Sequence, residues 1–371
     1  MIDWVKMHDQ KKFSAITPAL AYLSFLYGAA VRLRVRAYPN TKKKTLPGLV
    51  VSFGNLTVGG TGKTPATIML AEWAAAEGYR PAVLSRGYGG KRNKEVLEVS
   101  DGKNLLARPA EAGDEPYLMA RKLPGIPVIV SPNRHRAGLL AHKKHAANFF
   151  ILDDGFQHIA LKKDLDLVLI DSSHPFGNGH LLPWGPLREP IDHLKRGDAF
   201  VLTRAKGNGG KAGLSTIEFL RKRFPEKPLF LSEHLPEKIV FPNEDKDYNI
   251  SFLKGRRVLA FAGLARPGVL REALISLGSE VISFKAFKDH HVYTPGEIRQ
   301  LIREKNRLGL DLLITTEKDW VRLEGAVKEW ADLAYLKIRL VIADGSTDFW
   351  RLVKKKAEES GVRRQNTGDG S

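Results

Sequence analysis

Residues 54–65 combine glycines, a lysine and hydroxyl side chains at the spacing of a nucleotide phosphate loop. The glycines let successive backbone N–H groups turn toward phosphate oxygens, and the helix that follows directs its positive dipole end to the same anions. Lys63 would reach the β- and γ-phosphates of ATP, and the Thr64 hydroxyl suits Mg²⁺. The predicted nucleotide contacts are Thr57, Val58, Gly59, Gly60, Thr61, Gly62, Lys63 and Thr64.

This loop departs at one position from the usual pattern G-x-x-x-x-G-K-[ST], because Thr57 stands where the first glycine is expected. The alternative is an ordinary glycine turn between a strand and a helix. The Gly-Lys-Thr sequence and the apolar periodicity on both sides favour the phosphate loop. ATP or GTP binding is therefore the working hypothesis.

Two adjacent carboxylates, Asp153 and Asp154, follow the apolar segment 148–152. P-loop enzymes use acidic residues at such a strand end to hold Mg²⁺ or its waters. Because side chains alternate along a strand, we expect one carboxylate to approach the ion and the other to orient water or substrate. The alternative is a helix or turn cap.

Transfer of phosphate to a sugar hydroxyl needs a group that accepts the proton, and Asp114 is the candidate base. Asp114 lies in a loop before a helix that begins near Pro116, so capping of that helix is the alternative role. His290 and His291 follow a predicted strand in the second half of the chain. Adjacent residues face different ways, so one of the two could complete the site, and surface histidines without a role are the alternative.

Arg188 lies in a proline-punctuated loop, residues 182–190. A rigid loop with one arginine suits a phosphate clamp. The neighbouring Glu189 is a further candidate for the metal side, with Thr64 and the two aspartates. Arg86 follows another strand end, where open parallel sheets bind ligands, and an ordinary turn arginine is the alternative.

A parallel sheet would bring these residues together. Apolar segments predict strands at 48–54, 80–85, 127–131, 148–152, 166–170 and 199–203. Strand, helix, strand order implies parallel pairing, and uninterrupted apolar strands imply cover on both faces. The predicted fold class is α/β: a P-loop NTPase-like doubly wound parallel sheet, a second, smaller α/β domain and an N-terminal membrane-associating helix.

The chain is divided by composition and periodicity into four segments. These are an N-terminal amphipathic helix (1–40), a P-loop kinase domain (41–215), a second α/β domain (228–350) and a flexible tail (354–371). In the second domain, strands are predicted at 257–262, 280–284 and 311–315, and helices at 267–277 and 295–308. For residues 315–319 the sequence leaves two interpretations: a helix N-cap with a packed strand end, or a role near the nucleotide.

The N-terminal segment pairs an uncharged stretch with basic clusters. Residues 17–31 carry no charge, but 15 residues are fewer than the about 20 that span a bilayer. Arg32, Arg34 and Arg36 follow at once, and Tyr22, Phe25 and Tyr27 suit the membrane interface. We expect this helix to dock on a membrane surface, and a buried core helix is the alternative.

The net charge of +18, from 59 Lys and Arg against 41 Asp and Glu, predicts an anionic partner. No interleaved aromatic and basic surface is visible, so we expect no nucleic acid, whose binding would show steep salt dependence. The absence of cysteine excludes disulfides and thiolate metal sites and fits a reducing compartment.

The main alternative function is that of a membrane-associated, dimerising ATPase of the partition type. The phosphate loop of that class carries a lysine immediately before the two glycines, and here that position is Val58.

Taken together, these motifs resemble the tetraacyldisaccharide 4′-kinase family of lipid A biosynthesis. They are GNLTVGGTGKTP (54–65), SRGYGG (85–90), GDEP (113–116), DDGFQH (153–158), LREP (187–190), DHH (289–291) and TEKD (316–319). The resemblance covers residues from about 15 to 350, and the absent first glycine is normal in that family. Residues 263–267, Gly-Leu-Ala-Arg-Pro, depart from the glycine-richer sequence that the family would suggest.

The resemblance implies a kinase that moves the γ-phosphate of ATP, with Mg²⁺, to the 4′-hydroxyl of a tetraacylated glucosamine disaccharide 1-phosphate. This anionic lipid would be met at the cytoplasmic face of the bacterial inner membrane, which would account for the basic N-terminal helix. The family pattern pairs Asp114 with a histidine but does not choose between His290 and His291.

Overall fold

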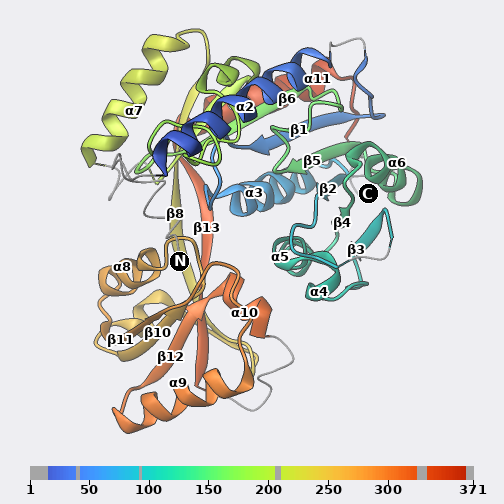
Figure 1. Ribbon diagram of the computed structural model, residues 1–371. Coiled ribbons are helices and arrows are strands. Elements are labelled where there is room, and N and C mark those ends of the chain that lie inside the picture. Colours follow the sequence, from blue (N-terminus) through green and yellow to red (C-terminus); the bar gives the residue numbers. More distant parts are fainter. Residues whose placement is uncertain (1–15, 39–41, 92–93, 205–209, 324–331, 365–371) are drawn as a thin grey trace, which may run out of the picture.

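The computed structural model describes residues 16–38, 42–91, 94–204, 210–323 and 332–364. Its thirteen described strands form one sheet that runs through two lobes (Figure 1). In sheet order they are β11 (Glu280–Ala286), β10 (Arg257–Ala262), β12 (Leu312–Thr316), β13 (Leu333–Asp344), β8 (Leu229–Phe241), β7 (Ala199–Thr203), β6 (Leu165–Asp171), β1 (Leu49–Gly54), β5 (Phe149–Asp153), β2 (Pro81–Ser85), β4 (Pro127–Val130) and β3 (Leu97–Asp101), and β9 (Lys246–Asn249) pairs with β8.

The first lobe is built around β1, which pairs in parallel with β5 on one side and β6 on the other. β2, β4 and β7 continue the parallel order, and β3 is an antiparallel edge strand. Every residue of β1, β5 and β6 is buried, as expected for strands that are covered on both faces. The doubly wound α/β sheet predicted from the sequence is confirmed.

Helices cover both faces of this sheet. They are α3 (Lys63–Ala76), α4 (Pro109–Ala112), α5 (Asp114–Lys122), α6 (Arg134–His145), η2 (Ile191–Arg196), α7 (Gly210–Arg223) and α11 (Ser346–Glu359). Side chains of α3, α5 and α11 share a buried cluster with Val51, whereas α6 packs with Val50 on the opposite face. Because alternate residues of β1 face opposite layers, a single strand serves both cores.

The second lobe has three parallel strands, β10, β11 and β12. Its helices are η3 (Ile250–Leu253), α8 (Gly268–Ser276), α9 (Pro295–Arg307) and α10 (Glu317–Leu323). α9 begins in a capping box: the Thr294 hydroxyl accepts from Glu297 N, and the Glu297 carboxylate accepts from Thr294 N. The predicted elements of this lobe agree with those observed to within about two residues.

An antiparallel pair of long strands, β8 and β13, joins the lobes (Figure 1). The start of β8 pairs with β7 in the first lobe, and the start of β13 pairs with β12 in the second. Sequence patterns did not reveal β13, because its residues pass from one lobe's core to the other's and so lack a uniform alternation.

The structure corrects two predicted boundaries: the end of the second domain at residue 350 and the start of the tail at residue 354. The end of β13 and helix α11 return to the first lobe, where Leu340, Ile342 and Phe349 lie in the same buried cluster as β1. The prediction starts the flexible tail at Lys354, but this residue lies inside α11, which continues to Glu359. This end of α11 is rich in lysine and glutamate, so its amphipathic pattern was not recognised in the sequence. Val353 and Ala357 form its buried side and are fully buried.

We expect Phe349→Ala to lower the free energy of unfolding by about 3–5 kcal/mol, because it removes a fully buried ring between α11 and the first-lobe core. Urea unfolding would measure the loss. Arg351→Ala, on the exposed side of the same helix, is the control and should change stability by no more than about 0.5 kcal/mol. Equal effects of the two variants would contradict the packing of α11.

Helix α2 (Thr17–Arg36) lies against the first lobe, with Thr17, Ser24 and Gly28 buried. It is five residues longer than the uncharged stretch and includes all three arginines at its C-terminal end. Among the described residues, no helix is both long and apolar enough to cross a membrane.

Candidate active site

The phosphate loop lies between β1 and α3, as predicted. Gly59 and Gly62 both have positive φ, +109° and +87°, a conformation that side chains rarely adopt. At Gly62 a Cβ atom would also lie 2.8 Å from His234 Nε2, so the turn has no room for one. Val58 N donates to Pro186 O at 2.8 Å, which ties this loop to the segment that carries Arg188.

Lys63, Asp154 and Arg188 meet beside this loop. The Lys63 ammonium lies 3.5 Å from Asp154 Oδ1 and 3.1 Å from Asn55 Oδ1. Arg188 Nη1 donates to Asp154 Oδ2 at 2.8 Å and to Gln157 Oε1 at 3.2 Å. Burial raises the pKa of Asp154, but the charges of Lys63 and Arg188 outweigh it and lower that pKa. Asp154 is therefore ionised between two cations.

Asp153 faces a different environment, at the buried end of β5. Ser85 Oγ donates to Asp153 Oδ2 at 3.0 Å, whereas Oδ1 is buried and makes no hydrogen bond. Burial, together with the nearby carboxylates of Glu115 and Asp154, raises the pKa of Asp153 to about 7. Asp154 has a φ of +51°, which turns it out of the strand, so the two carboxylates point differently.

The cross-lobe pair Asp114–His290 lies at the start of α5. His290 Nδ1 is 3.3 Å from Asp114 Oδ2, although the residues are 176 positions apart in the chain. His291 turns away and contacts Glu297, with 3.1 Å between Nε2 and Oε1. The structure therefore joins His290, and not His291, to Asp114, a choice that the sequence left open.

Glu189 does not face the other metal-side candidates. Its Oε2 atom lies 2.6 Å from His193 Nδ1 and 2.7 Å from Arg196 Nη2. Burial raises its pKa, but these partners outweigh burial and lower it. The structure thus occupies the Glu189 carboxylate with Arg196 and His193 inside the loop, while the adjacent Arg188 points to Asp154, so its role as a metal ligand stays a prediction.

A second group of basic residues surrounds His158. Burial lowers the pKa of His158 to about 4, and the charges of Arg134, Lys163, Arg34 and Arg86 add to the effect. His158 is therefore neutral at pH 7. The arginines come from α6, α2 and the end of β2, so three distant segments gather positive charge near Gln157, which donates to Asn55 O beside the phosphate loop.

Sequence reasoning assigned no role to Glu115 or His234. Glu115 follows Asp114, and its carboxylate is near enough to raise the pKa of Asp153. His234 lies on β8, a strand that was not predicted, and burial lowers its pKa to about 4. The GDEP motif was a usable signal for Glu115. No sequence signal pointed to His234, because its position beside Gly62 depends on the pairing of β8 with β7.

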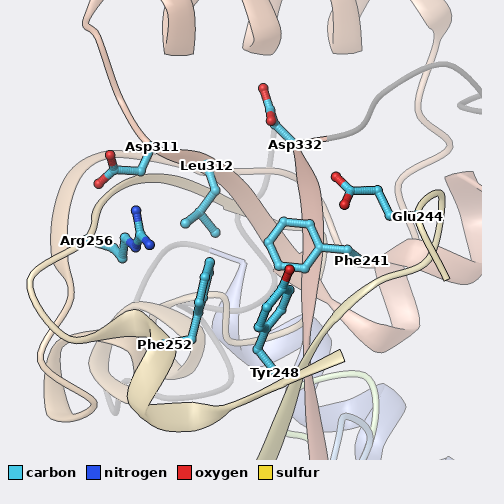
Figure 2. Close-up of a pocket in the computed structure, with 8 residues that line it drawn as sticks. All are labelled: Phe241, Glu244, Tyr248, Phe252, Arg256, Asp311, Leu312 and Asp332. Carbon is cyan, nitrogen blue, oxygen red and sulfur yellow. The ribbon is translucent and has the colours of Figure 1, made fainter. Parts of the chain in front are cut away.

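A small cavity of about 190 Å³ lies elsewhere, in the second lobe (Figure 2). It is lined by Phe241, Glu244, Tyr248, Phe252, Arg256, Asp311, Leu312 and Asp332. The rings of Tyr248 and Phe252 stack, with 4.5 Å between their centroids. Both are drawn among the lining side chains in Figure 2. None of the candidate catalytic residues lines it, so it is separate from the site at the phosphate loop.

Comparisons with protein families, with curated proteins and with solved structures all point to one family. A family model described as tetraacyldisaccharide-1-P 4′-kinase matches residues 16–358. The tetraacyldisaccharide 4′-kinase of Desulfatibacillum aliphaticivorans is 42% identical over 332 residues, 86% of this chain and 88% of that protein. The enzyme of that name from Syntrophus aciditrophicus is 39% identical over 345 residues, 91% and 92% of the two chains. A crystal structure of LpxK from Aquifex aeolicus in complex with ATP has a TM-score of 0.74 and 34% identity, covering 92% of this chain and 99% of that one.

Proposed function

The chain belongs to the tetraacyldisaccharide-1-phosphate 4′-kinase family, and from this we propose that it transfers the γ-phosphate of ATP to the 4′-hydroxyl of a tetraacylated glucosamine disaccharide 1-phosphate. The product would be the 4′-phosphorylated lipid A precursor. The observation that carries the proposal is the meeting of Lys63, Asp154 and Arg188 at the phosphate loop.

The phosphate side of the reaction uses charge and position. Lys63 and the loop N–H groups hold the β- and γ-phosphates, and Arg188 stabilises the charge that spreads over the γ-phosphate during transfer. In the structure both cations contact Asp154. We infer that ATP draws the cations toward its own oxygens, which leaves Asp154 available for the metal side.

The residues present fit a magnesium ion carried in with ATP. Asp153 offers a buried carboxylate oxygen with no hydrogen bond, Asp154 is the next residue, and Thr64 is the second residue of α3. Within the described residues, no cluster of three or more acidic or histidine side chains could hold a metal. Mg²⁺ commonly takes one or two carboxylates and fills its other positions with phosphate and water. When bound, it would neutralise the developing phosphate charge.

The proton of the acceptor hydroxyl passes to the Asp114–His290 pair. His290 Nδ1 lies 3.3 Å from the ionised Asp114 Oδ2, and this contact holds the imidazole in one orientation beside the carboxylate. Burial raises the pKa of Asp114, but His290 and Arg322 outweigh it and lower that pKa. Asp114 is therefore ionised at neutral pH, as a base or a partner of a base requires.

The acceptor lipid would enter beside α2. Exposed apolar side chains on this helix, Tyr22, Leu23, Phe25 and Leu26, form a face suited to acyl chains or a lipid surface. Arg34 reaches toward His158 and the basic group around it, which suits the anionic head of the substrate. Tyr27, expected at the membrane interface, instead donates from its hydroxyl to Arg188 O at 2.9 Å. We propose docking at the cytoplasmic face of the bacterial inner membrane.

We expect Phe25→Ser to weaken binding to vesicles that contain anionic lipid by about tenfold, because a large apolar side chain is lost from the docking face. Flotation of vesicles with bound protein would measure it. Ile282→Ser is the matched control, since Ile282 is also exposed but lies on β11 in the other lobe. Equal weakening by both variants would argue against α2 as the membrane contact.

The proposed activity is tested with labelled γ-phosphate on ATP and a tetraacylated disaccharide 1-phosphate in detergent micelles. We expect lipid-dependent label in the lipid product, and loss of product when a chelator removes Mg²⁺. Label released only as free phosphate, equally with and without lipid, would favour an ATPase and contradict the proposal. Product formed in excess chelator would contradict the magnesium part alone.

A further inference from the structure

Helix α10 and the Thr316-Glu-Lys-Asp319 segment that starts it have no role in the mechanism above. The helix belongs to the second lobe, yet three of its side chains contact α5 of the first lobe. Glu317 Oε2 accepts from Lys122 at 2.8 Å, and Lys318 donates to Glu115 Oε1 at 2.7 Å. The third contact, from Arg322 to Asp114, reaches the proposed catalytic pair.

Arg322 touches both members of that pair. Its Nε atom donates to Asp114 Oδ2 at 2.6 Å, and its Nη2 atom lies 3.2 Å from His290 Nδ1. The guanidinium side chain is only 4% exposed. A planar guanidinium can contact two groups in a fixed relation, which a flexible lysine cannot do. Arg322 is therefore placed to set the angle between the carboxylate and the imidazole.

Arg322 is itself anchored within its own lobe. Nη1 donates to Asp319 Oδ1 at 3.0 Å and to Gly263 O at 2.9 Å. Asp319 is fully buried and also accepts from Gly263 N, from Tyr293 Oη and from Thr316 Oγ1. The Gly263 carbonyl also accepts from His290 N at 3.3 Å. One network thus holds Arg322 and the His290 backbone together.

The contacts of Arg322 differ from those of the other side chains that join the two lobes. Lys122 and Lys318 also bridge the lobes, but neither contacts Asp114 or His290 in the described residues. Arg322 has one bond across the lobe boundary and two that hold it from behind. A side chain that only joined the lobes would not need contact with the imidazole.

We propose that Arg322, held by Asp319 and Gly263, is a positioning residue that orients Asp114 and His290 for acceptance of the acceptor's proton. The inference rests on the proposed function, and it assigns the 316–322 segment to the base side of the site rather than to the nucleotide. It acts through Asp114 and His290 and touches no substrate.

The kinetic test compares Arg322→Gln, Arg322→Lys and Lys122→Gln in the lipid-phosphorylation assay, after each is shown to be folded by circular dichroism. We expect Arg322→Gln to lower kcat about 100-fold with the KM for ATP within about twofold. Arg322→Lys should recover about tenfold, since its ammonium can still reach Asp114. Lys122→Gln, at the same interface, should keep kcat within about threefold.

Two kinetic results would overturn the inference: an unchanged kcat in Arg322→Gln, or an equal loss in Lys122→Gln. A double variant adds a further check. If Arg322 acts through Asp114, adding Arg322→Gln to Asp114→Asn should change kcat by no more than about twofold. A full additional 100-fold loss would show an independent effect and contradict a positioning role.

A measurement without substrates separates this inference from the proposed activity. The His290 imidazole resonance is identified by its absence in His290→Gln. We expect Arg322→Gln to move this resonance and Lys122→Gln to leave it in place. An unmoved resonance in Arg322→Gln overturns the positioning role even if the wild type phosphorylates the lipid. A moved resonance in a chain that makes no lipid product supports the positioning role and contradicts the activity.

Discussion

Replacing Asp114 with asparagine should lower kcat for lipid phosphorylation by about 10²- to 10⁴-fold, the range for loss of acid–base catalysis. The amide keeps the size of the side chain but neither takes up the proton nor carries the charge that orients His290. The KM for ATP should stay within about twofold, because the described contacts of Asp114 are with His290 and Arg322 and not with the phosphate loop. Steady-state kinetics with varied ATP would measure both quantities.

The adjacent histidines provide a matched comparison for this prediction. His290→Gln should lower kcat strongly, whereas His291→Gln should have a much smaller effect, because His291 contacts Glu297 and not Asp114. The two substitutions are chemically identical and one residue apart. Near wild-type turnover in Asp114→Asn, or similar losses in the two histidine variants, would remove the pair from the base role.

Replacing Lys63 with methionine should lower kcat/KM by about 10³-fold or more and weaken ATP binding as well. Methionine keeps much of the length and apolar stem but has no charge to place on the β- and γ-phosphates. It also leaves Asp154 with Arg188 as its remaining close cation among the described contacts. Binding of ATP, measured by calorimetry, and phosphoryl transfer would be followed on the same preparations.

Lys63→Arg is the charge-preserving control for this prediction. A guanidinium retains the positive charge but is bulkier and places its donors in a plane, so it should restore only part of the activity. This loss differs from that of Asp114→Asn, in which ATP binding is preserved. If Lys63→Met bound ATP as tightly as the wild type and transferred phosphate at the same rate, the assignment of residues 54–65 as a phosphate loop would fail.

The sequence by itself was sufficient for the features that depend on neighbours in the chain. The phosphate loop needs glycines, a lysine and a following helix within twelve residues, and the structure places Lys63 at the first position of α3. The buried strands were recognisable because fully covered strands are apolar throughout. Asp153 and Asp154 could be found because parallel strands end at one edge of the sheet.

The tertiary structure decided the features that depend on residues far apart in the chain. Only the packing of the second lobe against α5 selects His290 over His291 and brings Arg322 to Asp114. Only the fold of the loop shows that Glu189 is neutralised by Arg196. β13 and α11 return to the first lobe because their apolar side chains complete its core, and no local pattern records which core a side chain will join. Local sequence sets the strands, turns and helix starts, whereas long-range burial and charge pairing set which side chains meet.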